Sequence, residues 1–364
     1  MPKLGISIYP SKSSFNEMKN YLDRASALGY RRIFTSMLEV RDSIDETITN
    51  FKDIIQYGNT LGFETSIDVN PAVLHEIGIN PQDLGFFHDL GVTAVRLDEG
   101  FTGHEEALMT QNPYNIKIEI NISRGQHYID MIMDFGANRN NLTGCHNFYP
   151  QPYSGLGNDY LLATSAQYKK YQLTTAAFVD TPSGSVGPWP FADLMVTAEC
   201  ERTMDFATQV RFLKATNLID DIIISSSLVN DKDLKLASEV FNEPTMTLPI
   251  IINNSISDLE RTIAFEELHQ YRGDFSDYMI RSSQPRVKYR NQSIPPKEGP
   301  TTFKRGDVII GNDNFGQYKG ELQIVLQPFD NHANYNLIGH VDSTADILIK
   351  FLHPWHNFKL RQQD

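Results

Sequence analysis

From residue 4 to about residue 242, short runs rich in β-branched and apolar residues alternate with longer amphipathic segments. In the longer segments the apolar residues recur every three or four positions, which is the period of an amphipathic helix. The helical segments include residues 15–28, 44–61, 126–135, 159–171, 201–214 and 231–241. The runs expected to form strands are residues 4–9, 32–36, 63–70, 92–98, 117–123, 142–149, 173–180 and 221–225.

Eight strand signals separated by helical ones favour an α/β fold, the closed parallel (β/α)₈ barrel, over a β-sandwich. A barrel of this kind uses about 250 residues. The sequence therefore predicts a barrel domain over residues 1–242. The helix expected after the third strand is interrupted by Gly78 and Pro81.

The pattern changes after Phe241. Residues 243–249 are typical of a linker that enters a strand at residues 250–253, and Ser257 with Glu260 forms the capping-box pattern of a helix start. The sequence predicts a second, small and mostly β domain over residues 243–364. Its further strands are expected at residues 307–310, 321–327, 335–341 and 347–352.

Several predicted barrel strands carry polar residues on one face only. Side chains alternate across a strand, so the isoleucines of residues 117–123 share one face and the polar groups share the other. A barrel interior with a purely structural role favours branched apolar residues. Polar interiors that continue to the carboxyl ends of the strands therefore indicate chemistry at that rim. The inward polar residues are Ser66, Asp68, Asn70, Arg96, Asp98, Glu119, Asn121 and Ser123.

Composition limits the choice of partner. The formal net charge of −13 disfavours nucleic acid, whose phosphate backbone requires a basic surface. An anionic small molecule would need a local cluster of arginine, lysine or helix N-termini. Cys145 and Cys200 are too few for a disulfide framework, and no run approaches the roughly 20 apolar residues of a membrane span. We expect a cytoplasmic protein without a membrane partner, and the sequence leaves a homo-oligomer open.

Adjacent carboxylates, Asp98 and Glu99, end the fourth predicted strand. Glycoside cleavage needs a proton donor at the leaving oxygen and a second group at the anomeric centre. A 2-acetamido sugar can supply its own nucleophile, so Glu99 would protonate the leaving group while Asp98 orients the acetamido nitrogen. The alternative is an ion pair between Arg96 and Asp98, with Glu99 in solvent. A flexible loop from Gly100 to Gly103 favours the catalytic interpretation.

Asp180 ends the seventh predicted strand, just before a loop rich in proline and glycine at residues 181–190. It is either a second catalytic carboxylate or a cap of the turn. Trp189 in this loop offers a flat face for a sugar ring. Asp68 and Glu39 are further strand-end carboxylates, for which a structural or hydrogen-bonding role is expected.

His146 lies in the sixth predicted strand, where it is either a packing residue or a ligand contact. A metal site built from Asp68, Asp98 and His146 is not expected, because no H-x-H or H-E-x-x-H spacing occurs. No nucleotide-binding glycine pattern is present, so no cofactor is expected either. The candidate substrate contacts are Asp68, Asn70, Arg96, Asn121, His146, Asn147, Tyr149 and Trp189.

Two places could bind a phosphate. Ser225 follows the eighth predicted strand and precedes a helix, which is the usual phosphate corner of such barrels. Residues 281–290 form the densest basic stretch, in which Arg281 and Arg286 could grip a phosphate in bidentate fashion. The alternative for this stretch is a solvated edge strand.

Short motifs recur in order along nearly the whole chain. They are GISIYP (residues 5–10), FTS (34–36), DVNP (68–71), RLDEGF (96–101), HNFYP (146–150), TPSG (181–184) and SSQPR (282–286). Together they resemble the bacterial 6-phospho-N-acetylmuramidase family.

The resemblance implies a barrel over residues 1–242 followed by a cyclophilin-like β domain over residues 243–364. It implies an exo-glycosidase that acts on a phosphorylated disaccharide during cell-wall recycling. The enzyme would cleave the β-1,4 bond to N-acetylglucosamine and release N-acetylmuramic acid 6-phosphate. Asp98 and Glu99 match the family's LDEG-type motif, and Arg281 and Arg286 its RSSQPR-type motif. Ser11 is a departure, since an acidic residue is expected after the first strand's proline in many relatives.

Two other function classes stay open from the sequence. A sugar-phosphate isomerase or aldolase could use the same barrel, but Schiff-base chemistry needs a lysine near a strand's carboxyl end, whereas Lys117 opens its strand. A non-enzymatic protein would bind a sugar or peptide in a groove of the β domain. The polar barrel interior disfavours this last class.

Overall fold

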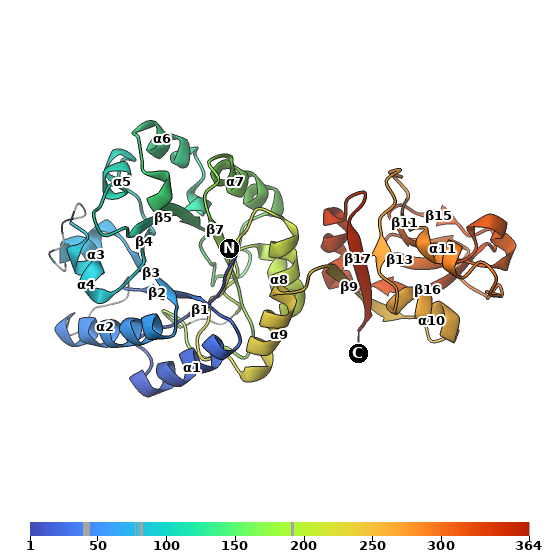
Figure 1. The fold of residues 1–364 in the computed structure, drawn as a ribbon, viewed down its shortest axis with the longest axis horizontal. Helices are drawn as coiled ribbons and strands as arrows, with labels where there is room; N and C mark the ends of the chain where they lie inside the picture. Colours follow the sequence, from blue (N-terminus) through green and yellow to red (C-terminus); the bar gives the residue numbers. More distant parts are fainter. Residues whose placement is uncertain (39–43, 77, 79, 81–82, 191–192, 364) are drawn as a thin grey trace. The chain divides into compact units, whose positions relative to one another are not determined.

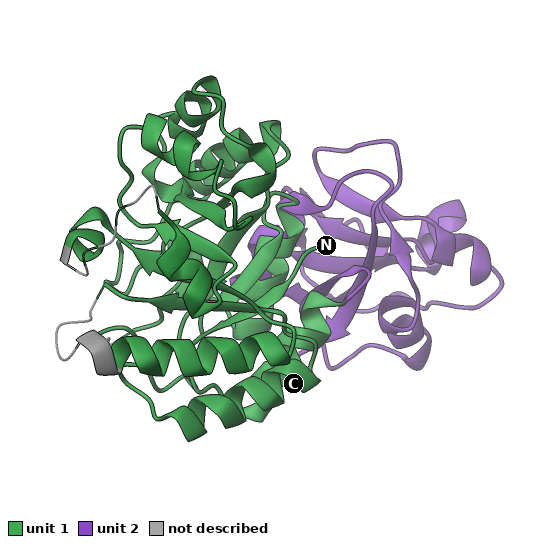
Figure 2. Cartoon of the chain, turned by 60° about the vertical axis from the view of Figure 1, so that its left-hand side comes forward, with its two compact units in different colours: residues 1–242 green, residues 243–364 purple. Residues whose placement is uncertain are grey.

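The computed structural model describes residues 1–363 apart from residues 39–43, 77, 79, 81–82 and 191–192. The chain divides into two compact units, Met1–Asn242 and Glu243–Asp364 (Figure 2). Each unit has a hydrophobic core of its own. No helix in the described part of the chain combines the length and the apolar character that a membrane span requires.

The first unit is a closed barrel of eight parallel strands that pair in sequence order, with β8 returning to β1 (Figure 1). The predicted (β/α)₈ barrel is therefore confirmed. Because the strands are parallel, their carboxyl ends meet at one rim, where the following loops gather. The strands are β1 (Leu4–Ser7), β2 (Arg32–Ser36), β3 (Glu64–Val69), β4 (Ala94–Leu97), β5 (Lys117–Asn121), β6 (Leu142–Cys145), β7 (Thr175–Val179) and β8 (Asp221–Ile224).

Helical periodicity located the longer helices. In α1 (Phe15–Ala27), Ser14 and Glu17 form a capping box that satisfies the first amide groups. The prediction of a helix over residues 201–214 was wrong at its start, because the Asp205 side chain caps a new helix there. The other long helices are α2 (Ile44–Thr60), α6 (Tyr128–Asp134), α7 (Asn158–Lys170), α8 (Phe206–Ala215) and α9 (Asp231–Phe241).

Sequence periodicity supplied no bounds for three short helices, although it indicated an interrupted helix after the third strand. They are α3 (Pro71–Glu76), α4 (Gly85–Leu90) and α5 (His104–Met109), each of 6 residues. Fewer than two turns give no periodic signal that distinguishes a helix from a loop. The interruption expected after the third strand separates α3 from α4, although Pro81 itself lies outside the described residues.

Aromatic and charged side chains share the barrel interior. Tyr9, Phe34 and Phe178 belong to one buried cluster, in which the rings of Phe34 and Phe178 meet edge to face at 5.0 Å. The isoleucines of β5, Ile118 and Ile120, belong instead to the larger core formed with the surrounding helices. This separation is the one that strand alternation predicts.

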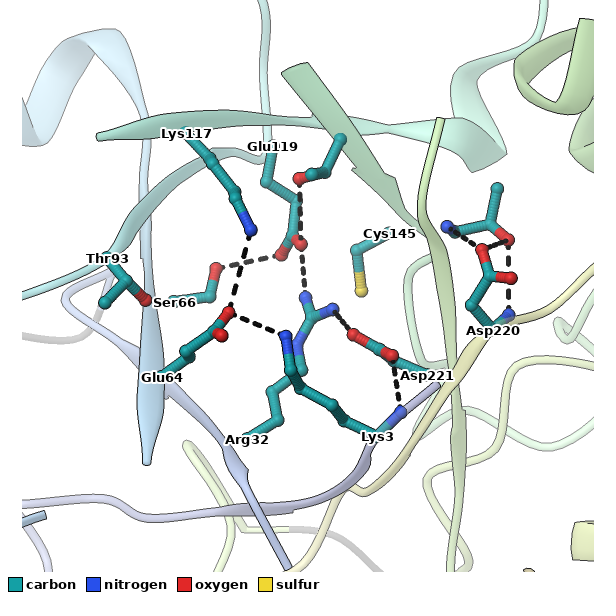
Figure 3. Close-up of polar contacts among 12 residues, drawn as sticks. Lys3, Arg32, Glu64, Ser66, Thr93, Lys117, Glu119, Cys145, Asp220 and Asp221 are labelled. Carbon is teal, nitrogen blue, oxygen red and sulfur yellow. Dashed lines mark hydrogen bonds and ion pairs between the residues drawn. The ribbon is translucent and has the colours of Figure 1, made fainter. Parts of the chain in front are cut away.

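A buried ion-pair network lies at the amino-terminal end of the barrel (Figure 3). Arg32, at the start of β2, reaches across the interior to Glu119 of β5 and to Asp221 of β8, whose Oδ2 is 2.6 Å away. The Ser66 hydroxyl donates to Glu119 Oε1 at 2.8 Å. Glu119 and Ser66 point inward as expected, but they belong to this network and not to the catalytic rim.

We expect Glu119→Gln to lower the free energy of unfolding by about 3 kcal/mol, because it removes one anion from the buried Arg32. The matched control is Glu64→Gln at the same end of the barrel. Glu64 pairs with Lys3 but is 43% exposed, so its loss should cost less than about 1 kcal/mol. Urea unfolding of both variants measures the difference. Equal losses would contradict a structural role for the buried network.

The second unit is built on one seven-stranded sheet with the order β10-β17-β9-β16-β13-β14-β11. α10 (Asp258–Phe265) begins with the predicted capping box of Ser257 and Glu260. The strand predicted at residues 347–352 was wrong, because the 3₁₀ segment η5 (Ser343–Phe351) buries Ala345, Leu348 and Ile349 at helical spacing. The sheet contains β9 (Met246–Ile252), β10 (His269–Gln270), β11 (Met279–Ser282), β13 (Asp307–Gly311), β14 (Leu322–Val325), β16 (Tyr335–Val341) and β17 (Asn357–Gln362).

The other elements of this unit are short. β12 (Thr302–Phe303) and β15 (Phe329–Asp330) pair as a separate two-stranded sheet. The main sheet is antiparallel except where β9 pairs with β17. The second unit is therefore mostly β, as predicted.

Candidate active site

A pocket of about 440 Å³ opens at the carboxyl ends of β4, β5 and β6. Three consecutive strand-end loops contribute to it, which is the usual construction of a barrel active site. Five predicted site residues meet here, from the catalytic pair to the amide and tyrosine candidates. The residues that line the pocket are Asp98, Glu99, Gly100, Asn121, Ser123, Arg124, Asn147 and Tyr149.

The buried guanidinium of Arg96 joins the strands around this pocket. It donates to Asp68 Oδ1 at 2.5 Å and to Asn147 Oδ1, and its Nη1 lies 3.5 Å from Asp98 Oδ1. Asp68 and Arg96 are partners in the register of β3 and β4. About a third (32%) of the Asp98 side chain remains exposed. The ion pair considered from the sequence therefore exists, and Asp98 still faces the pocket.

Three predicted substrate contacts have other partners. Asp68 and Arg96 are only 4% and 2% exposed, and they bind each other behind the pocket wall. Burial raises the pKa of Asp68 to about 7, although Arg96 opposes the shift. Asn70 accepts a hydrogen bond from the Val73 amide at 2.8 Å and so helps to start α3. Glu39, the other strand-end carboxylate, lies outside the described residues.

A buried carboxylate, Glu106, fixes the loop that follows β4. It accepts hydrogen bonds from the amides of Phe101 at 2.5 Å and Gly103 at 2.7 Å, and from the Tyr128 hydroxyl. The loop that the glycines suggested to be flexible is therefore tied to α5 and α6. Glu99 within it is exposed.

Amide and hydroxyl groups connect the other loops of the pocket. Asn121 Nδ2 donates to the Asp98 carbonyl at 3.1 Å, and its Oδ1 accepts from the Ser123 amide at 3.0 Å. The Ser123 hydroxyl oxygen in turn accepts from the Asn147 amide at 3.0 Å. Asn121 thus orients the loops, while Asn147 and Tyr149 are half-buried along the pocket.

His146 is buried and does not line the pocket. Its Nδ1 lies 3.1 Å from the Ser123 hydroxyl and its Nε2 2.8 Å from that of Ser165. Both ring nitrogens therefore have hydroxyl partners within the protein, which favours the packing interpretation, and the substrate contact stays a prediction. Within the described part of the chain, no three His, Cys, Asp or Glu side chains are grouped to hold a metal ion.

The pH dependence of the free energy of unfolding should reveal the lowered pKa of His146. Burial, with Arg96 nearby, lowers its pKa from 6.5 to about 3, so the folded imidazole stays neutral. Between these pH values the unfolded chain binds a proton that the folded chain does not. Stability should therefore fall on acidification, by up to about 1.4 kcal/mol per pH unit. We expect His146→Gln to reduce this pH dependence in urea unfolding, with the exposed His104→Gln as control. An unchanged slope would contradict the assignment.

Asp180 and Ser225 are fully buried beside the loop that follows β7. Asp180 accepts hydrogen bonds from the amides of Thr181 at 2.9 Å and Met195 at 2.7 Å, and from the Ser226 hydroxyl. Ser225 donates its hydroxyl to the Met195 carbonyl at 2.6 Å. Asp180 therefore caps the turn, the second of its two expected roles. Burial and these hydrogen bonds disfavour a catalytic role for Asp180 and a phosphate contact for Ser225, and both assignments stay predictions.

Trp189 lines a second pocket, of about 480 Å³, together with Lys12 and the loop at residues 184–190. Its ring lies 6.1 Å from that of Phe148. Phe148 stands in the sequence between Asn147 and Tyr149, which line the first pocket. The two pockets therefore border the same loop, the one that follows β6.

Arg281 and Arg286 converge on a carboxylate within the second unit. Arg281 Nε lies 2.7 Å from Glu321 Oε1, and Arg286 Nη1 lies 3.3 Å from Glu321 Oε2. Glu321 is fully buried, so both cations already compensate an internal charge. Their assignment to a phosphate stays a prediction.

Two cations of the barrel pockets, Arg124 and Lys12, were not singled out from the sequence. Arg124 follows the end of β5, and Lys12 follows the end of β1. This position after a barrel strand is the feature of the sequence by which both could have been identified as site residues. Lys12 stands next to Ser11, where the resemblance leads one to expect an acidic residue.

Adjacent carboxylates in a polar pocket at the carboxyl-terminal rim of a (β/α)₈ barrel are an arrangement that a barrel hydrolase can use. Comparison with known proteins is consistent with this class. Residues 4–239 match the N-terminal model, and residues 246–361 the C-terminal model, of 6-phospho-N-acetylmuramidase. The chain belongs to the 6-phospho-N-acetylmuramidase family, which is a family of glycosidases.

Two solved structures are similar over nearly the whole chain. An uncharacterized protein from B. cereus is 36% identical, with 99% of each chain covered and a TM-score of 0.89. A conserved Enterococcus faecalis protein of unknown function is 22% identical, with 99% of this chain and 96% of that chain covered and a TM-score of 0.73. No curated protein matches the chain.

Proposed function

We propose that the chain hydrolyses the β-1,4 bond between N-acetylmuramic acid 6-phosphate and N-acetylglucosamine. The observation that carries this proposal is the pocket in which Asp98 and Glu99 lie side by side at the active rim. Family membership supports the choice of substrate. Because the substrate is a phosphorylated disaccharide, we place the reaction in the cytoplasm, as a step of peptidoglycan recycling.

Asp98 is suited to orient the 2-acetamido group. Arg96 lies 3.5 Å from one carboxylate oxygen of Asp98 and restrains this side chain. The exposed part of the Asp98 carboxylate can accept a hydrogen bond from the acetamido N–H. This contact turns the acetamido oxygen toward the anomeric carbon. The oxygen then forms a bond to that carbon as the bond to the leaving sugar breaks.

Glu99 is suited to act as the general acid and then as the general base. Its carboxylic acid donates a proton to the glycosidic oxygen as N-acetylglucosamine leaves. The resulting carboxylate takes a proton from the water that opens the cyclic intermediate. The exposed position of Glu99 allows it to exchange protons with solvent between turnovers.

The pocket of Trp189 is suited to the leaving N-acetylglucosamine. An indole ring offers apolar area to one face of a sugar ring at a small cost in side-chain entropy. Asn147 and Tyr149 line the first pocket, next in the sequence to Phe148, whose ring lies beside that of Trp189, and they can bind sugar hydroxyls. A disaccharide would then extend across the loop that follows β6.

The sugar-phosphate isomerase or aldolase alternative has less support. No lysine is among the described residues that line the Asp98–Glu99 pocket. Lys117 lines a pocket at the opposite end of the barrel, beside Arg32 and Glu64 (Figure 3). Schiff-base chemistry therefore has no nucleophile among these lining residues.

Glu99→Gln tests the assignment of the acid. It should lower kcat for the phosphorylated disaccharide by about 1,000-fold and leave KM within a few fold, because the amide cannot transfer the proton. Release of N-acetylglucosamine measures turnover. The control is Glu239→Gln, an exposed carboxylate near the end of α9. Near-normal kcat in Glu99→Gln would remove this residue from the chemistry, and an inactive wild-type protein would refute the proposed function.

Trp189→Ala tests the place of the leaving sugar. It should raise KM for the disaccharide roughly tenfold, through lost stacking. It should leave hydrolysis of the methyl glycoside of N-acetylmuramic acid 6-phosphate unchanged, since that substrate has no N-acetylglucosamine. Phe135→Ala, an exposed aromatic residue at the end of α6, is the control. Equal effects on both substrates would contradict the assignment.

A further inference from the structure

The electrostatics of the pocket require a cation. The proposed substrate carries a phosphate and a lactyl carboxylate, whereas the pocket contributes Asp98 and Glu99 and the chain has a net charge of −13. Long-range attraction cannot bring such an anion to the site. Binding must therefore depend on a positive group within the pocket itself.

Arg124 meets this requirement. It is the last residue of the 3₁₀ turn η1 (Ile122–Arg124), directly after β5, and its exposed side chain lines the pocket beside Asp98 and Glu99. Within the described part of the chain, no carboxylate forms an ion pair with it. The guanidinium of Arg96, by contrast, is buried and already holds two carboxylates.

The position of the Arg124 guanidinium is built into the structure. Its Cζ stacks 4.3 Å from the centre of the Tyr128 ring, and the Tyr128 hydroxyl is bound by buried Glu106. A side chain at Gly100 would lie 2.7 Å from Arg124 Nη1 and 2.3 Å from the Tyr128 hydroxyl. Glycine at this position thus leaves the room that the guanidinium occupies. A stacked guanidinium keeps its N–H edge free for an oxyanion.

We infer that Arg124 binds an oxyanion substituent of the sugar that occupies the Asp98–Glu99 pocket. This inference rests on the proposed function. The substituent is the 6-phosphate or the lactyl carboxylate, since planar bidentate recognition by arginine suits both groups. Arg124, in the barrel unit, thereby determines specificity for sugars that carry such an oxyanion.

The test compares Arg124→Met, which keeps most of the stem over Tyr128, with Arg124→Lys, which keeps the charge. Three substrates are used: the phosphorylated muramic disaccharide, the same disaccharide without phosphate, and N-acetylglucosamine 6-phosphate linked to N-acetylglucosamine, which lacks the lactyl group. Arg124→Met should lower kcat/KM for the first roughly 30-fold, mostly through KM. Arg124→Lys should recover part of the loss.

The two substrates that lack one substituent each identify the group that Arg124 binds. If Arg124 holds the phosphate, Arg124→Met should have no effect on the substrate without phosphate and its full effect on the one without the lactyl group. If it holds the carboxylate, the pattern reverses. Equal losses on all three substrates, or unchanged KM with a lower kcat, would overturn the inference. Arg139→Met, an exposed arginine before β6 at the opposite rim, is the matched control.

A binding measurement separates this inference from the proposed function. Calorimetric titration with N-acetylmuramic acid 6-phosphate should give a dissociation constant roughly 30-fold weaker for Arg124→Met than for the wild type. Equal dissociation constants would refute the role of Arg124 even if the enzyme is active. Weakened binding in Arg124→Met together with an inactive wild type would refute the reaction and leave the anion site standing. Arg281→Met in the same titration tests the other predicted phosphate contact.

Discussion

The candidate site depends on one buried cation, Arg96. A guanidinium removed from water is stable only where anions and acceptors surround it. Arg96 obtains them from Asp68 on β3, from Asp98 at the end of β4 and from Asn147 after β6. Its Nε has no partner among the described residues, so its hydrogen bonds come from the two terminal nitrogens. The strand ends that form the pocket are therefore held in place by the same contact that orients Asp98.

The barrel interior contains two groups of ion pairs, one around Arg32 and one around Arg96, and they differ in their exposure to solvent. Around Arg32, the side chains of Glu119 and Asp221 are 1% and 3% exposed, so they compensate a buried charge and are not accessible to a substrate. Around Arg96, a third of Asp98 remains in contact with solvent. The same ion-pair chemistry thus serves as a structural element at one end of the barrel and as support for a reactive group at the other.

The periodicity of the sequence was sufficient for the barrel because each strand has two different faces. Inward polar residues such as Asn121 and outward isoleucines such as Ile118 set the strand pattern, and amphipathic segments set the long helices. It was insufficient for the bounds of α3, α4 and α5, which are too short to show a period. It also failed at residues 347–352, where an apolar run that suggested a strand packs with helical spacing.

By itself, the sequence determined the barrel, the mostly β second unit and the placement of Asp98 and Glu99 at a strand end, because these follow from local periodicity and position along the chain. Only the tertiary structure decided which polar residues are exposed. Asp180, His146 and Ser225 all stand at strand ends, yet buried amides, hydroxyls and a carbonyl take up their hydrogen bonds. Arg124 comes from a short turn with no pattern of its own, and it reaches the pocket because β4 and β5 are neighbours. Burial and partners arise from contacts between distant segments, and such contacts leave no mark on local periodicity.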